Sequence, residues 1–131
     1  MIKFFSKNRF IFYSINFVII LLYIFPGSIL GLAIYKDINI QPQITPNFIL
    51  SSNHFYVFVV LSVIGLLSFR VSKQRKYLII YLISLSILLE VFHLIIPARS
   101  FQWSDLFGNL FGVIVVIFLN SFINKYGGSQ N

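Results

Sequence analysis

The sequence contains no cysteine, only three acidic residues and few charged residues of any kind. Without cysteine the chain can form neither disulfides nor thiolate sites. Charged residues make up 10% of its 131 residues and hydrophobic residues 58%, and the mean hydropathy is +0.90. Soluble domains are ordinarily less apolar and more highly charged than this. The composition therefore predicts an integral membrane protein in which residues 1–131 form a single membrane domain.

Four apolar runs are long enough to be read as membrane-spanning segments, at residues 10–34, 53–69, 77–96 and 105–123. Their hydrophobicity is continuous and does not alternate with period two, which favours helices over the strands of a membrane barrel. We therefore predict an all-α fold, a four-helix transmembrane bundle with short loops. Within the first run, Pro26 and Gly27 predict a kink or an end of the helix. A cleaved signal peptide is the alternative for this N-terminus, but the run exceeds a signal's usual apolar core and lacks a clear small-x-small cleavage site.

The formal charge of +7 comes from basic residues that cluster beside the apolar runs. One cluster precedes the first run, and "RVSKQRK" at residues 70–76 links the second run to the third. The loops on the opposite side contain Lys36 and Arg99 as their only basic residues. By the positive-inside rule, both termini are expected to be cytoplasmic. Because membrane topology accounts for the charge, no nucleic-acid partner is predicted.

Polar residues gather in "LLEVFHLIIPARSFQWSDLFGNLFG", residues 88–112. A carboxylate within the hydrocarbon costs roughly 2.5–3.5 kcal/mol on insertion scales, so Glu90 points to a bundle interior and a functional site. Counting along the helices puts Glu90 and Asn109 at similar depths in the outer leaflet. The third and fourth runs are expected to be antiparallel neighbours because a short loop joins them. The predicted polar cluster consists of Glu90, His93, Arg99, Asp105 and Asn109, completed by His54 at the start of the second run.

Several structural explanations compete with a functional one for these residues. Gly108 and Gly112 have small-xxx-small spacing, which would let the third and fourth helices approach closely. An ion pair of Arg99 with Glu90 or Asp105 would lock the outer hairpin without any chemistry.

Metal and nucleophile chemistry find weaker support in the sequence. Glu-x-x-His is the spacing of di-iron carboxylate bundles, but those bundles need a second such pair and two further glutamates. A mononuclear site would draw on Glu90, His93, Asp105 and His54, with Arg99 as a repulsive neighbour. Nucleophilic catalysis would need Ser100 or Ser104 beside His93, and nothing in the sequence determines that geometry. No cofactor or metal is therefore predicted.

The stretch E-x-x-H-x-x-x-P-x-R-S-x-x-x-S-D-x-x-x-N-x-x-G, from Glu90 to Gly112, closely resembles the core motif of the VanZ-like family of small bacterial membrane proteins. The resemblance implies that the polar residues of this stretch correspond to those of the family. At the second run, "SSNHFYVF" keeps His54 and Phe58 but lacks the Asp-Lys pair common in the family. The family's connection with glycopeptide (teicoplanin) resistance implies antibiotic resistance and the cell envelope as the biological setting, and a bacterial cytoplasmic membrane as the location.

We expect the outer-leaflet site to bind a polar or anionic envelope component, such as a lipid-linked headgroup. Arg99 and His93 would contact this component, and Glu90 and Asp105 would orient them. The expected partners are membrane lipids, including a lipid-linked envelope intermediate. Two alternatives stay open: a membrane enzyme acting on envelope lipids with Glu90 and His93 as acid and base, and a structural scaffold in envelope machinery.

Overall fold

The computed structural model describes residues 2–46 and 48–127, and the side chains from Arg9 onward within these ranges. The described chain contains helices and no strands, so the all-α prediction is confirmed. The five helices are α1 (Ile2–Ile24), α2 (Ile29–Tyr35), α3 (Ser52–Ser68), α4 (Ser72–Phe92) and α5 (Trp103–Tyr126).

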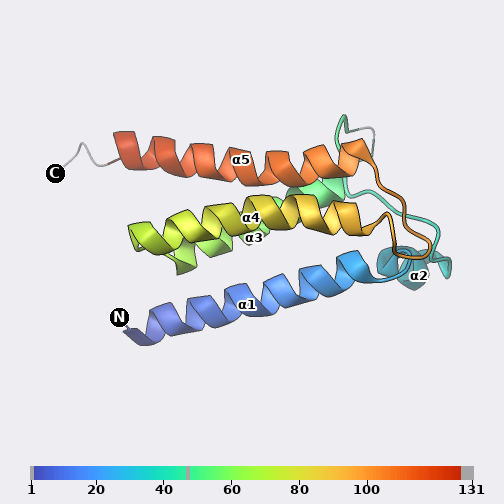
Figure 1. Cartoon of the computed structure of the whole chain (residues 1–131), viewed down its shortest axis with the longest axis horizontal. Coiled ribbons are helices and arrows are strands. Elements are labelled where there is room, and N and C mark those ends of the chain that lie inside the picture. Colours follow the sequence, from blue (N-terminus) through green and yellow to red (C-terminus); the bar gives the residue numbers. More distant parts are fainter. Residues whose placement is uncertain (1, 47, 128–131) are drawn as a thin grey trace.

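The four long helices lie side by side as a bundle (Figure 1). α1 and α4 run towards one end of the bundle, and α3 and α5 run back from it. That end, which we call the loop end, carries α2 and the two long connections, residues 36–51 and 93–102. The opposite end carries both chain termini and the short connection from α3 to α4. The predicted polar cluster belongs to the loop end, since α4 finishes there and α5 begins there.

The first apolar run is broken where the sequence predicts it. α1 from Arg9 onward and α2 meet at an angle of 75°. Pro26 lacks the N–H that would continue the helix, and Gly27 has a φ of +98°, which side chains with a Cβ rarely adopt. Ser28 then starts the new helix, because its Oγ accepts a 3.0 Å hydrogen bond from the N–H of Gly31. Residues 10–34 therefore form two helices and not one continuous span.

The described helices differ in whether they are long and apolar enough to cross a membrane. α5 is long and apolar enough to cross a membrane alone, and α1 from Arg9 onward qualifies together with α2 as one bent segment. α3 is a shorter apolar helix. α4 ends at Phe92, before the expected Ile96, because the chain passes into turns, and its first residues are polar and basic. Membrane crossing by all four long helices therefore stays a prediction.

The glycine pair of α5 does not face the helix that the sequence analysis expected. A Cβ on Gly112 would lie 2.6 Å from the Phe55 carbonyl and 3.0 Å from the Phe58 Cβ, and both belong to α3. A Cβ on Gly108 would lie 2.9 Å from the carbonyl of Ser51, which precedes α3. The close approach is therefore between α5 and α3, two helices that run in the same direction. The expectation of a glycine contact between the third and fourth spans was wrong, because chain adjacency does not decide which faces pack.

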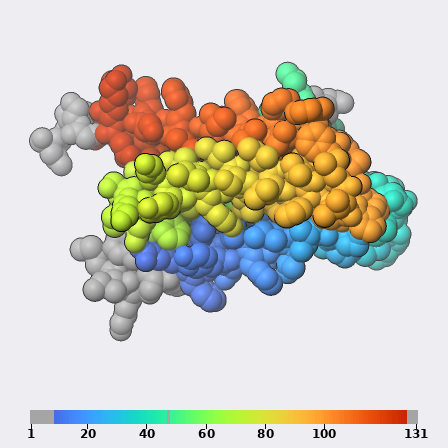
Figure 2. Space-filling view, viewed as in Figure 1, coloured from blue at the N-terminus to red at the C-terminus, as the bar shows by residue number. Residues whose placement is uncertain are grey.

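α4 lies between α1 and α5 on one face of the molecule (Figure 2). Leucines of α4 and apolar side chains of the other three long helices form one buried cluster. Its centre contains Phe58, Leu61, Leu82 and Val113, none of which is exposed. The packing of this cluster holds the helix ends at the polar site in register.

Gly112→Ala should destabilise the protein by about 1–3 kcal/mol, because the new methyl group meets the backbone of α3, which cannot move aside cheaply. Gly65→Ala is the matched control, since its Cβ would meet only side-chain ends, those of Leu78 and Phe12. Both substitutions gain about 1 kcal/mol of helix propensity. The difference between their unfolding free energies therefore reports the steric cost of the new methyl group alone. Thermal unfolding in detergent measures it. Equal stability of the two variants would contradict the close contact between α3 and α5.

Candidate functional site

The site at the loop end begins with the broken end of α1. Since the helix stops, its last carbonyls have no partner within the helix. The Arg99 side chain donates from Nη2 to the Leu22 carbonyl at 2.9 Å and from Nε to the Phe25 carbonyl at 3.1 Å. His93 Nε2 lies 3.1 Å from the Tyr23 carbonyl and must donate to it, because a carbonyl only accepts. The connection after α4 thus caps α1 with a cation and an imidazole, as the negative end of a helix dipole favours.

Arg99 therefore has a different role from those weighed in the sequence. It makes no ion pair with Glu90 or Asp105 among the described residues, and its partners are the carbonyl of Leu22 in α1 and that of Phe25, the residue after α1. Burial lowers the pKa of Arg99, while Tyr23, Asp105 and Glu90 raise it. A guanidinium nevertheless stays charged at any physiological pH. The ion-pair clamp weighed from the sequence is thus not formed among the described residues, and Arg99 instead joins the α4–α5 connection to the end of α1.

Glu90 lies in the last turn of α4, and its side chain is completely buried. Oε1 accepts a 2.9 Å hydrogen bond from the N–H of Gln102, the residue before α5. The carboxylate therefore sits at the positive end of the α5 dipole, where a negative charge is stabilised. Oε2 lies 3.2 Å from Nδ1 of His93, but the geometry is not that of a hydrogen bond. Among the described residues, Oε2 is thus a buried oxygen without a hydrogen-bond partner.

The first turns of α3 and α5 contribute His54 and Asp105, both buried. Their closest approach is 3.6 Å, between Nε2 of His54 and Oδ2 of Asp105. The other nitrogen of His54, Nδ1, is 2.7 Å from the Ser51 hydroxyl. Asp105 Oδ1 accepts from the Ser104 hydroxyl at 3.4 Å. One ligand atom from each of His54, Glu90 and Asp105 lies within 4.8 Å of the others, so three helices bring together a group that could hold a metal ion.

Asn109 lies one turn further into α5, and neither of its polar atoms is free. Its Nδ2 donates to the Ser86 carbonyl of α4 at 3.1 Å, and its Oδ1 accepts from the Tyr23 hydroxyl at 2.6 Å. Asn109 therefore contacts α4 one turn below Glu90, and not at the same depth. Because its hydrogen bonds join three helices, Asn109 supports the site and is not available to a ligand.

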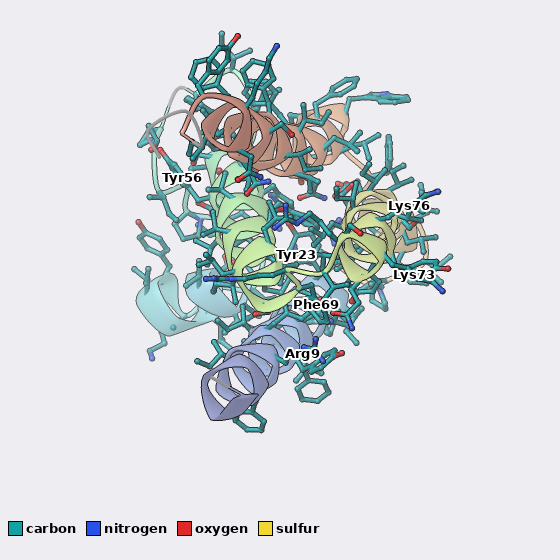
Figure 3. The ribbon with its side chains drawn as sticks, turned by 90° about the vertical axis from the view of Figure 1, so that its left-hand side faces the viewer. Arg9, Tyr23, Tyr56, Phe69, Lys73 and Lys76 are labelled. Atoms are coloured by element: carbon teal, nitrogen blue, oxygen red, sulfur yellow. The ribbon has the colours of Figure 1, made fainter. Side chains whose placement is uncertain are left out.

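Tyr23 is a central residue of the site that the sequence analysis missed. Its ring stacks on His93 with centroids 5.8 Å apart and meets His54 edge-on at 5.0 Å. Figure 3 shows Tyr23 in the interior between the four long helices. The signal in the sequence is weak, because a tyrosine in an apolar run of aromatic residues is unremarkable. Only the hydrogen bonds of its hydroxyl and carbonyl, to Asn109 and His93, reveal its importance.

Cavities open beside this cluster at the loop end. One of about 200 Å³ lies between the 36–51 and 93–102 connections, and its lining includes His93, Arg99 and Asp105. A second is lined by His54, Tyr23 and Arg99, and a third by Asp105 and the residues before α3. Gln41 lines all three. The structure therefore brings His54, Glu90, His93 and Asp105 together next to space that a small polar group can enter.

No protein-family model, curated protein or solved structure matches this chain. The chemistry of the site must therefore be argued from its own residues.

Arg99→Ala should lower the stability of the protein by about 1–3 kcal/mol, because the carbonyls of Leu22 and Phe25, at the end of α1 and just after it, lose charged donors. The stability of Arg99→Lys should lie between those of the wild type and Arg99→Ala, since an ammonium group keeps the charge but lacks the planar fork of donors that reaches both carbonyls. Lys73→Ala at the opposite end, where Lys73 is exposed on α4, is the control (Figure 3). Unfolding in one detergent compares the three variants. An Arg99→Ala variant as stable as Lys73→Ala would show that the capping of α1 is energetically unimportant.

Proposed function

We propose that this chain is a multi-pass protein of a bacterial cytoplasmic membrane, with its loop end in the outer leaflet and both termini in the cytoplasm. In this proposal the loop-end cavities bind the polar part of a cell-envelope component. The observation that carries the proposal is the convergence of buried His54, Glu90, His93 and Asp105 beside solvent-accessible cavities.

The distribution of apolar and polar side chains supports a membrane environment. Glu90 and Asn109 are completely buried, whereas Phe10 is 72% and Phe118 67% exposed. Large apolar side chains are exposed along all four long helices. Such a polar interior inside an apolar surface suits lipid, where intramembrane ionisable groups face the bundle interior.

The basic residues support the proposed orientation. The exposed Lys73 and Lys76 lie at the end of the bundle that carries the termini (Figure 3). Arg70 belongs to the connection from α3 to α4 at the same end, and Arg75 to the first turn of α4. A cytoplasmic position of this end agrees with the positive-inside rule. Anionic lipid headgroups on that side would add to the attraction.

The chemistry of the cavities favours an uncharged, hydrogen-bonding group over an anion. Arg99 uses two of its nitrogens on the carbonyls of Leu22 and Phe25, so its guanidinium is not free to hold a phosphate through its whole fork of donors. Side-chain amides and a hydroxyl, from Asn39, Gln41 and Ser100, complete the lining. Sugar hydroxyls or peptide amides of an envelope precursor match these donors and acceptors. The resemblance to VanZ-like proteins agrees with an envelope ligand and with an effect on glycopeptide susceptibility.

A membrane enzyme acting on envelope lipids is the second candidate. The proximity of Nδ1 of His93 to Oε2 of Glu90, 3.2 Å apart, favours it, since a neighbouring carboxyl group and imidazole can act as acid and base towards a bound substrate. In that case the Glu90→Gln variant would bind the same component but leave it unchanged.

The topology can be tested directly because the chain has no cysteine of its own. Single cysteines at residues 45 and 73 should respond differently to an impermeant thiol reagent in intact cells. Labelling is expected at 45 only, and at both positions after the cells are opened. Labelling of residue 73 in intact cells would reverse the proposed orientation.

The ligand should be found by mass spectrometry of small molecules and lipids that co-purify with the protein. Gln41→Leu should reduce its recovery roughly tenfold, because an amide that borders all three cavities is replaced by an apolar group. Gln74→Leu, the same change near the start of α4, should have no effect. Equal recovery with both variants would contradict binding in the loop-end cavities, and glycopeptide susceptibility of the same strains gives a cellular measure.

A further inference from the structure

We propose that His54, Glu90 and Asp105 form a site for one divalent transition-metal ion such as Zn²⁺, joining α3, α4 and α5. This inference goes beyond the binding of an envelope component and does not depend on it. It rests on three independent features of the described residues: the spacing of the ligand atoms, the unpartnered oxygen of Glu90, and the hydrogen bond that orients His54.

The spacing of the ligand atoms suits a small ion. One atom from each of the three side chains lies within 4.8 Å of the other two. Nε2 of His54 and Oδ2 of Asp105 are 3.6 Å apart. Two ligands about 2.1 Å from a tetrahedral Zn²⁺ lie about 3.4 Å from each other, so this pair needs little movement. The ligand atom of Glu90 would have to move closer to this pair when the ion binds.

Oε2 of Glu90, which accepts no described hydrogen bond, could bind a cation. Oε2 has no hydrogen-bond partner in the described part of the chain although the side chain is 0% exposed. Nδ1 of His93 lies 3.2 Å away but not in hydrogen-bond geometry. Leaving a buried carboxylate oxygen without a hydrogen bond is costly. A cation would take up its lone pairs, while Oε1 keeps its hydrogen bond from Gln102.

The surroundings of His54 prepare its Nε2 as a ligand. A metal-binding histidine ordinarily donates its other ring N–H to a neighbouring oxygen. Here the Ser51 hydroxyl, 2.7 Å from Nδ1, offers that acceptor. Nε2 would then carry a lone pair directed towards Asp105. The first turn of α3 also favours a neutral imidazole over a cation, because of the helix dipole.

Charge balance points to a divalent ion, and the donor set to a transition metal. Glu90 and Asp105 carry two negative charges, and neither forms a described ion pair with Arg99. A divalent ion would neutralise them and outweigh the repulsion from Arg99. An imidazole with two carboxylates suits Zn²⁺ or Mn²⁺ better than Ca²⁺ or Mg²⁺, which prefer oxygen ligands alone. The cavity beside Asp105 leaves room for water as a fourth ligand.

The test measures Zn²⁺ retained by the full chain in detergent, purified without a polyhistidine tag. The protein is stripped with EDTA, given Zn²⁺, freed of excess metal by gel filtration and analysed by elemental mass spectrometry. We expect about one Zn²⁺ per chain and a thermal transition raised by roughly 5 °C. His54→Gln, Glu90→Gln and Asp105→Asn should each reduce retention by roughly tenfold or more.

Asp37→Asn is the matched control, because Asp37 lies in the 36–51 connection outside the proposed ligand set, and it should retain Zn²⁺ fully. Should a ligand variant fail to fold, the wild-type protein decides: Co²⁺ in place of Zn²⁺ should give visible absorption bands that Zn²⁺ abolishes by competition. Wild-type protein that retains less than about a tenth of an equivalent would overturn the proposal. A folded Asp105→Asn variant with undiminished Zn²⁺ would do so as well. Recovery of the envelope component is measured separately, so either proposal can fail alone.

Discussion

The broken end of α1 is the constraint on which the rest of the site depends. A helix that stops inside an apolar bundle leaves carbonyls that must find donors from other parts of the chain. Arg99 and His93 supply these donors, and in doing so they bring the α4–α5 connection against α1. Tyr23, held at the same place, then extends its hydroxyl to Asn109 of α5. The capping of one helix thus positions residues from all parts of the site.

Helix direction explains which charges lie where. α1 and α4 end at the loop end, while α3 and α5 begin there. Arg99 and His93 cap the negative end of α1, whereas the carboxylates of Glu90 and Asp105 lie at the positive end of α5. Each placement is favoured by the helix dipole. This arrangement lets a strongly apolar bundle contain ionisable groups at modest cost. It keeps Glu90 and Asp105 near one another with histidines, and no described arginine or lysine, within ion-pair distance.

The close packing of α3 against α5 brings two residues of the polar site together. Gly108 and Gly112 allow the two helices to run close together in the same direction. Their first turns therefore lie side by side, as the 3.3 Å hydrogen bond from the Ser51 N–H to the Ser104 carbonyl shows. His54 and Asp105 meet for this reason. The packing of α3 against the glycines of α5 consequently determines the distance between His54 and Asp105.

The sequence alone determined the helical class, the break at Pro26 and Gly27, and most of the residues of the buried polar cluster, because apolar runs, turn residues and rare charges in apolar runs are local signals. Tertiary structure decided their partners. Arg99 was expected to meet a ligand or a carboxylate, yet its acceptors are backbone carbonyls more than seventy residues away, which no side-chain pattern marks. Likewise, small-xxx-small spacing predicts a close helix contact but not its partner. Tyr23 stayed hidden because its importance comes from hydrogen bonds made only after four helices pack together.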